Sequence, residues 1–215
     1  VGEEKFKSFL SKIGILEELK FDITEVVKPI EFNWGKCPLA TASFGHGITT
    51  TLLQLAKAYS IIVNGGYKIN PTLIKRKEKK QPIRILNEDV SEKVLPILRK
   101  VVTTKNGTAS LANIDGFDIG GKTGTAQKSV DGGYSKKKIN TFVSVFPISK
   151  PKFVLAIMLD EPQISKDYIY NYRDGSNIKY KGTPFNTAGW TTVEVAGQII
   201  EKIGPILATK YSEAY

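Results

Sequence analysis

The segment GGKTGTAQ, residues 120–127, sets one lysine between a glycine and a threonine, and two apolar runs follow it. Runs of this length and composition, bounded by turn residues, are typical of strands. The segment and the two runs therefore predict three strands, at 117–127, 139–148 and 152–160. A polar loop with Asp131-Gly132-Gly133 joins the first pair, and the tight turn SKPK at 149–152 joins the second. Such short connections predict that consecutive strands are antiparallel.

Within the first strand, alternate side chains share a face, so Thr123 and Thr125 should project together while Lys122 and Gly124 belong to the other alternation. Two hydroxyls with an ammonium nearby can bind a carboxylate. Gly124 has no side chain, so a ligand can lie against the strand there, and an exposed backbone N–H could stabilise an oxyanion. The residues alone predict an anion-binding edge strand, although the same short string also occurs by chance in plain strands near turns.

The rest of the chain predicts helices packed on this sheet. Apolar residues recur at helical spacing in four segments, at 3–13, 50–63, 88–104 and 189–203. A threonine at 49–51 would cap the second helix, and Pro96 would kink or break the third. Less regular segments predict short strands or a hairpin at 20–36, a strand at 67–76, a basic loop at 75–82, a polar turn or short helix at 107–113, and a long surface loop at 161–187. We expect an α/β (α+β) fold in which helices flank an antiparallel sheet.

Composition excludes several classes of function. The chain has 215 residues and a formal net charge of +10, but lysine runs occur only at 75–80 and 136–138 and no nucleic-acid motif accompanies them. A nucleic-acid binder is therefore the weakest hypothesis. The single cysteine and single histidine, Cys37 and His46, exclude an internal disulfide, a cysteine-based zinc site and a multi-histidine metal centre. No apolar stretch approaches the ~20 residues that span a bilayer.

Several linked segments resemble the class B penicillin-binding proteins. GGKTGTAQK at 120–128 resembles the third motif of that family, and lysine–threonine–glycine is one signature string of β-lactamases and penicillin-binding proteins. ATASFGHGITTTLLQLAKAYSIIVNGGY at 40–67 resembles another family segment, with Leu52 where the family usually has proline. GTA at 107–109 and AGWTTVEVAG at 188–197 agree more loosely. The resemblance covers nearly the whole chain.

The resemblance implies a penicillin-binding/serine β-lactamase-like transpeptidase fold, incomplete at its N-terminal side, with residues 1–215 as the C-terminal portion of a single transpeptidase domain. It implies a peptidoglycan D,D-transpeptidase that cross-links stem peptides in septal cell-wall synthesis through an acyl-serine intermediate. Lys122 and Thr125 would be catalytic, the lysine keeping the cleft positive and the Thr125 N–H acting as an oxyanion donor. Thr123, Gly124 and Thr125 would bind the terminal carboxylate of the substrate or of a β-lactam.

The same resemblance implies the partners and the place of action. The partners would be stem peptides ending in D-Ala-D-Ala, β-lactams and membrane proteins of the division complex, with no nucleic acid, metal or organic cofactor. The protein would act on the outer (periplasmic) side of the bacterial plasma membrane, held by an N-terminal anchor that this chain lacks.

Two further motifs of the family, serine–x–x–lysine and serine–x–asparagine, have no suitable match. The first string occurs at 135–138, 149–152 and 176–179, in what we predict to be a lysine-rich loop, a hairpin turn and the long loop. None is at the start of a buried helix, so we expect the acylated serine upstream of Val1 and the chain alone to be inactive. A serine β-lactamase or β-lactam sensor, an elongation-type transpeptidase, and a non-catalytic interaction module that uses 161–187 remain alternatives.

Overall fold

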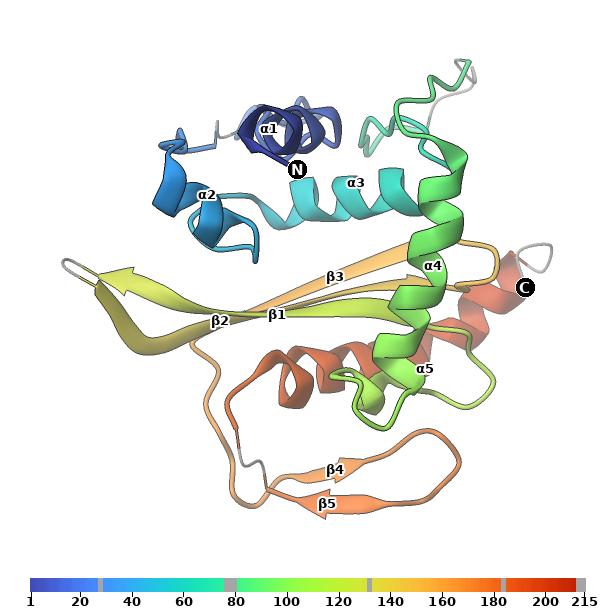
Figure 1. The fold of residues 1–215 in the computed structure, drawn as a ribbon. Coiled ribbons are helices and arrows are strands. Elements are labelled where there is room, and N and C mark those ends of the chain that lie inside the picture. Colours follow the sequence, from blue (N-terminus) through green and yellow to red (C-terminus); the bar gives the residue numbers. More distant parts are fainter. Residues whose placement is uncertain (27–28, 76–80, 131–132, 183–184, 212–215) are drawn as a thin grey trace. The chain divides into compact units, whose positions relative to one another are not determined.

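The computed structural model describes residues 1–26, 29–75, 81–130, 133–182 and 185–211 (Figure 1). They form two compact units, Val1–Glu92 and Lys93–Tyr215. The division falls inside α4 (Glu88–Thr103). Of the predicted kink or break at Pro96, the break is wrong, because the helix continues through that residue. Among the described residues, no helix has both the length and the apolar character needed to cross a membrane.

The first unit is built from α1 (Glu3–Lys12), α2 (Lys36–Ala42) and α3 (Leu52–Val63). Its core contains Leu10, Ile13, Ile15, Ala58 and Ile61. The predicted cap of α3 is confirmed: the Thr51 hydroxyl accepts from Gln54 N, and the Gln54 side chain accepts from Thr51 N. Gln54 is fully buried and also donates to the Glu17 carbonyl at 2.7 Å, which ties the start of α3 to the segment after α1.

The strands predicted at 20–36 and 67–76 are wrong for the residues that the structure describes. Residues 20–26 and 29–35 form neither helix nor strand, and the later segment contributes one bridge, between Tyr67 and Arg84. That bridge uses the backbone groups of Gly66 and Lys68, and the Asn64 side chain bonds the N–H and the C=O of Tyr67, which point to the opposite edge. Residues 27–28, residue 76 and most of the predicted basic loop lie outside the described part.

The second unit contains the predicted antiparallel sheet, in the order β1 (Gly120–Val130), β2 (Gly133–Phe146) and β3 (Phe153–Asp160). The β1–β2 hairpin is longer than predicted, because the lysine-rich residues 134–138 extend β2 rather than forming a loop. These residues fit a strand because most of them are exposed and because Tyr134 and Lys138 pair with Ser129 and Gln127 of β1, on either side of a register shift. Asp131 and Gly132 of the predicted loop lie outside the described residues.

One long helix, α5 (Thr192–Lys210), packs on a face of this sheet (Figure 1). Its buried residues Val193, Ala196 and Ile200 belong to the same core cluster as Phe142 and Phe146 of β2. The helix runs past the predicted end at residue 203. Two short 3₁₀ helices, η1 (Ser110–Ala112) and η2 (Ala188–Trp190), complete this side of the sheet, and η1 agrees with the turn predicted at 107–113.

The long loop predicted at 161–187 contains structure that the sequence pattern did not indicate. β4 (Ile169–Asn171) and β5 (Lys179–Lys181) pair as a two-stranded ribbon beyond α5 (Figure 1). Tyr170 of β4 is buried in the main core, with its ring centroid 5.2 Å from that of Trp190. Strands of three residues are too short to show an alternating pattern, which explains why the ribbon was missed.

We predict that Gly66→Ala destabilises the first unit far more than Gly45→Ala. Both glycines have positive φ, at 83° and 86°, so both variants carry the left-handed strain of about 1 kcal/mol. A Cβ at Gly66 would lie 2.1 Å from the Leu86 carbonyl oxygen, whereas nothing lies within 4 Å at Gly45. Overpacking should add about 1–3 kcal/mol at Gly66 alone. Urea unfolding followed by Trp34 fluorescence in a Trp190→Phe background measures both losses, and equal losses would refute the steric argument.

Candidate active site

Strand β1 presents the predicted motif at an edge. In the described residues, β1 pairs with β2 and with no strand on its other side. Thr123 lies opposite Phe142, which packs in the core with α5, whereas Lys122 lies opposite Val143 on the other face. Directly paired residues share a face, so the Thr123 and Thr125 side chains point toward the α5 side of the sheet. The alternation expected from the sequence therefore holds in the structure.

The two threonine hydroxyls already have partners that orient them. The Oγ1 atoms of Thr123 and Thr108 are 2.7 Å apart. The backbone N–H of Ala188, in η2, donates to Thr125 Oγ1 at 3.0 Å. A hydroxyl has one proton and two lone pairs, so this bond uses an acceptor site of Thr125 and leaves its proton for another acceptor. The arrangement favours Thr125 as a hydrogen-bond donor toward a ligand.

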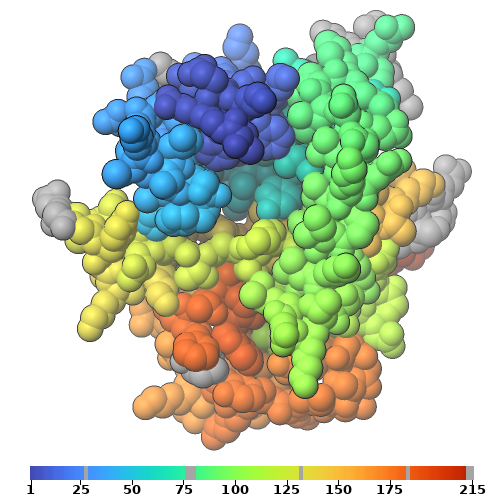
Figure 2. Space-filling view, viewed as in Figure 1, coloured from blue at the N-terminus to red at the C-terminus, as the bar shows by residue number. Residues whose placement is uncertain are grey.

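Both threonines open into one cavity of about 340 Å³. Its walls carry five hydroxyl side chains and two aromatic rings, and its lining residues are Gly107, Thr108, Ser110, Leu111, Thr123, Thr125, Tyr172, Thr187, Gly189 and Trp190. On the face shown in Figure 2, the orange-red segment before α5 lies against the yellow-green residues of β1, as the bond from Ala188 to Thr125 requires. A cavity lined by both hydroxyl donors and aromatic rings suits an anion with an apolar part.

Lys122 is exposed at the strand edge, and its ammonium donates to the Thr123 carbonyl at 2.8 Å. Other lysines of the hairpin have acidic partners: Lys128 contacts Asp160 at 2.6 Å and Glu161 at 2.7 Å. The hydrogen bonds that its ammonium donates to the carboxylates of Asp160 and Glu161 raise the pKa of Lys128. In the part of the chain that the structure describes, no carboxylate contacts Lys122, so its charge is available to attract an anion.

Packing against the neighbouring strand is a further reason for glycine at position 124. A Cβ at this position would lie 2.6 Å from the Thr141 hydroxyl of the neighbouring strand, and that hydroxyl donates to the Gly124 carbonyl at 3.4 Å. A side chain at position 124 would therefore displace the Thr141 hydroxyl, which gives the glycine a packing role as well. Its role in ligand approach stays a prediction.

The structure adds residues that the motif did not reveal. Thr108 and Trp190 line the cavity with the two threonines. Each lies in a short string that resembles the family only loosely, GTA at 107–109 and AGW at 188–190. The Ala188 N–H that bonds Thr125 could not be predicted from the sequence, because it is a backbone group that nearly every residue has. The three serine–x–x–lysine strings lie within β2, between β2 and β3, and between β4 and β5, so none begins a helix. The first is in a strand, not in the predicted loop.

Comparisons with known proteins place this geometry in a family. The family model described as "Penicillin binding protein transpeptidase domain" matches residues 1–179. The Caulobacter vibrioides protein "Probable peptidoglycan D,D-transpeptidase FtsI" is 29% identical over 98% of this chain and 35% of its own length. The Neisseria meningitidis protein "Probable peptidoglycan D,D-transpeptidase PenA" is 34% identical over 75% of this chain and 28% of its own. The chain thus spans about a third of the length of these curated relatives.

A solved structure confirms the predicted fold class. The transpeptidase domain of Burkholderia pseudomallei penicillin-binding protein 3 superposes with a TM-score of 0.76 at 27% identity, covering 97% of this chain and 58% of that one. The antiparallel sheet with flanking helices, the strand that carries lysine–threonine–glycine and the match over residues 1–179 agree with one another. The chain belongs to the transpeptidase-domain family of the penicillin-binding proteins.

Proposed function

We propose that this chain is the C-terminal portion of a single transpeptidase domain and supplies the carboxylate-binding side of a peptidoglycan D,D-transpeptidase site. One observation carries the proposal: Thr123 and Thr125 open into a shared cavity on an edge strand whose Lys122 is not matched by a carboxylate within the described residues. The relatives named as D,D-transpeptidases support the same reaction. The substrate would be a stem peptide ending in D-Ala-D-Ala, with β-lactams as its mimics.

The hydroxyls bind the terminal carboxylate by donating to it. Thr125 keeps its proton for this purpose because Ala188 N–H occupies a lone pair of its oxygen. Thr123 donates to the substrate when it accepts from Thr108, so the pair at 2.7 Å acts as a short relay. Lys122 extends past the strand edge and adds a favourable potential for the negative charge.

Thr125 also has a backbone group suited to an oxyanion. Along an antiparallel strand, the N–H and C=O of one residue point to the same edge, and those of the residue two positions later do so as well. The Thr123 carbonyl meets Lys122 Nζ at the unpaired edge of β1. The Thr125 N–H then belongs to that edge, where it can donate to the carbonyl oxygen of a scissile amide as negative charge develops.

The nucleophile lies elsewhere in the longer protein. We infer a serine activated by the lysine of a serine–x–x–lysine motif, because none of the three strings in this chain begins a helix. The acyl-serine would then be attacked by an amine of a neighbouring stem, which forms the cross-link. We also propose a septal role, with division-complex partners and outside the plasma membrane; the relative named FtsI supports the septal role.

Removing the Thr125 hydroxyl should impair acylation. In the full-length protein, Thr125→Val keeps the shape and loses a hydrogen bond to a charged group, worth about 1.5–3 kcal/mol. We expect the second-order rate constant for labelling by a fluorescent penicillin to fall about 10- to 100-fold. Thr125→Ser is the matched control, because it keeps the hydroxyl, and it should stay within about threefold of wild type. An equal fall of the labelling rate constant in both variants would contradict the role of the Thr125 hydroxyl as a hydrogen-bond donor.

Lys122→Ala should also slow acylation, by about tenfold, because the site loses a cation near the bound carboxylate. Lys128→Ala is the control on the same strand, since its ammonium is already held by Asp160 and Glu161. We expect Lys128→Ala to label at nearly the wild-type rate at physiological salt. Normal labelling of the Lys122 variant would mean that the charge is not used.

The 215-residue chain by itself should form no covalent adduct with a fluorescent penicillin. The reason is that its serine–x–x–lysine strings sit in strands and connections, where no helix start presents the serine to a base. Gel fluorescence with intact-protein mass spectrometry checks this, with the full-length protein as the positive control. A penicilloyl adduct on any serine of the short chain would contradict the assignment.

A further inference from the structure

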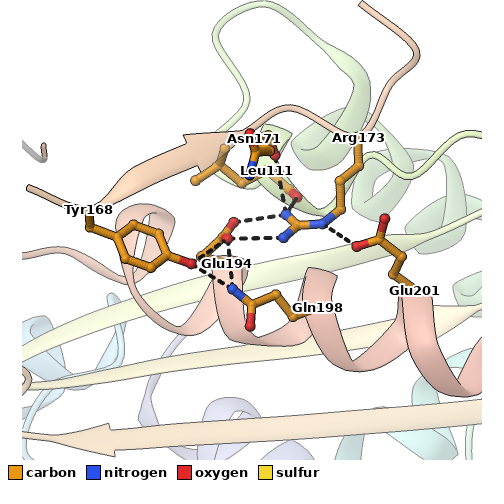
Figure 3. Close-up of polar contacts among 7 residues, drawn as sticks. All are labelled: Leu111, Tyr168, Asn171, Arg173, Glu194, Gln198 and Glu201. Atoms are coloured by element: carbon orange, nitrogen blue, oxygen red, sulfur yellow. Dashed lines mark hydrogen bonds and ion pairs between the residues drawn. The ribbon is translucent and has the colours of Figure 1, made fainter. Parts of the chain in front are cut away.

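Arg173 is a charged residue that is almost wholly withdrawn from water. Its side chain is 7% exposed, and it lies between the β4–β5 ribbon and α5 (Figure 3). The guanidinium donates to both carboxylate oxygens of Glu194, at 2.8 and 2.9 Å, and to Glu201 at 2.9 Å. It also donates to two backbone carbonyls, those of Leu111 at 3.1 Å and Asn171 at 3.4 Å. One planar group thus joins four separate positions of the chain.

Glu194, the main partner, is also buried, with 5% of its side chain exposed. Tyr168 Oη and Gln198 Nε2 donate to its Oε1 atom, each at 3.0 Å (Figure 3). Burial opposes ionisation of Glu194, but the hydrogen bonds from Arg173 and Gln198 prevail and lower the pKa of the carboxyl. The pair is therefore ionised at neutral pH. Because desolvation offsets much of the attraction in a buried ion pair, stability alone is a weak reason for it.

One of the positions that Arg173 joins lines the cavity beside Thr123 and Thr125, and two others are close in sequence to lining residues. Leu111 lines the cavity directly, together with its η1 neighbour Ser110. Tyr172, adjacent to Arg173 in sequence, is another lining residue. Glu194 lies in the first turn of α5, four residues after the lining residue Trp190. The guanidinium therefore bonds one lining residue, Leu111, and ties it to the first turn of α5, which continues the chain from the lining residue Trp190.

Close packing shows that this spacing is tight. A Cβ on Gly197 of α5 would lie 2.9 Å from the Leu111 carbonyl oxygen and 3.0 Å from Arg173 Nη1. Helix α5 and η1 thus approach each other as closely as their backbones allow, with the guanidinium at the contact. Lysine has no planar fork of donors and could satisfy only part of this set.

We propose that Arg173 is the positioning residue of the carboxylate-binding cavity. It holds η1, Tyr172 and the first turn of α5 at the separation that keeps Thr108 against Thr123 and Ala188 N–H against Thr125. This inference rests on the function proposed above. Without the guanidinium, the walls separate, the hydroxyl donors lose their alignment, and recognition of the carboxylate weakens although every residue that touches the ligand is intact.

The test compares two ligands in the full-length protein. Benzylpenicillin carries the carboxylate and its methyl ester does not, so the ratio of their acylation rate constants measures carboxylate recognition. We expect Arg173→Lys to lower this ratio at least about tenfold, since small displacements of binding groups are costly. Arg99→Lys is the matched control, because Arg99 also joins a carbonyl, that of Ile119 at 2.6 Å, to a carboxylate, that of Asp118 at 3.3 Å. Its ratio should stay within about twofold of wild type.

Hydrogen exchange supplies a readout that does not depend on the reaction. In Arg173→Lys, the amides of Ala112, Asn113 and Trp190 should exchange faster, while those of β2 keep their protection, because the change loosens the walls and spares the sheet. Unchanged exchange at these amides, or an equal fall of the ligand ratio in Arg99→Lys, would overturn the positioning role. A wild-type protein that is acylated by neither ligand would overturn the proposed function instead, and the exchange data would still report on the walls.

Discussion

The register between β1 and β2 is the constraint on which the second unit depends. It sets Thr125 opposite Asn140, a fully buried residue whose amide donates to Asn186 at 3.0 Å and to Thr191 at 2.9 Å. Those two residues flank η2, and η2 supplies the N–H that reaches Thr125. A slip of one residue would turn the threonines to the other face and separate all of these groups. The pairing therefore places the hydroxyls, and the segment before α5 orients them.

The cavity is assembled from segments that are distant in sequence and short in length. η1 and η2 have three residues each, and neither would be stable alone. Their positions come from side chains that bond to backbone groups: Thr125 to the N–H of Ala188, and Arg173 to the carbonyl of Leu111. Polar contacts thus hold η1 and η2 in place. Helix α5 and the sheet are held by apolar packing instead, with Phe142, Val193 and Ile200 in one core.

Much of the fold could be read from the sequence because it depends on local patterns. The apolar runs predicted the three strands, and the threonines at 49–51 predicted a cap at the start of α3. The hydroxyl face of β1 followed from strand alternation alone. Other features depend on partners far along the chain: Arg173 and Glu194 are 21 residues apart, and Thr125 and Ala188 are 63 apart. The pattern near Tyr67 predicts a strand, but the described residues form one bridge with Arg84, and the Asn64 side chain bonds the Tyr67 groups on the opposite edge.

The group that donates to Thr125 is the main-chain N–H of residue 188, and this determines which substitutions at that residue preserve the hydrogen bond. Almost every amino acid brings the same N–H to position 188, so replacement of the side chain does not delete the bond. Proline alone lacks the group. Ala188 is also 1% exposed, so bulk would displace η2. Small residues other than proline are therefore expected at position 188. A proline there would remove the bond that orients Thr125, although the lysine–threonine–glycine string itself would be unchanged.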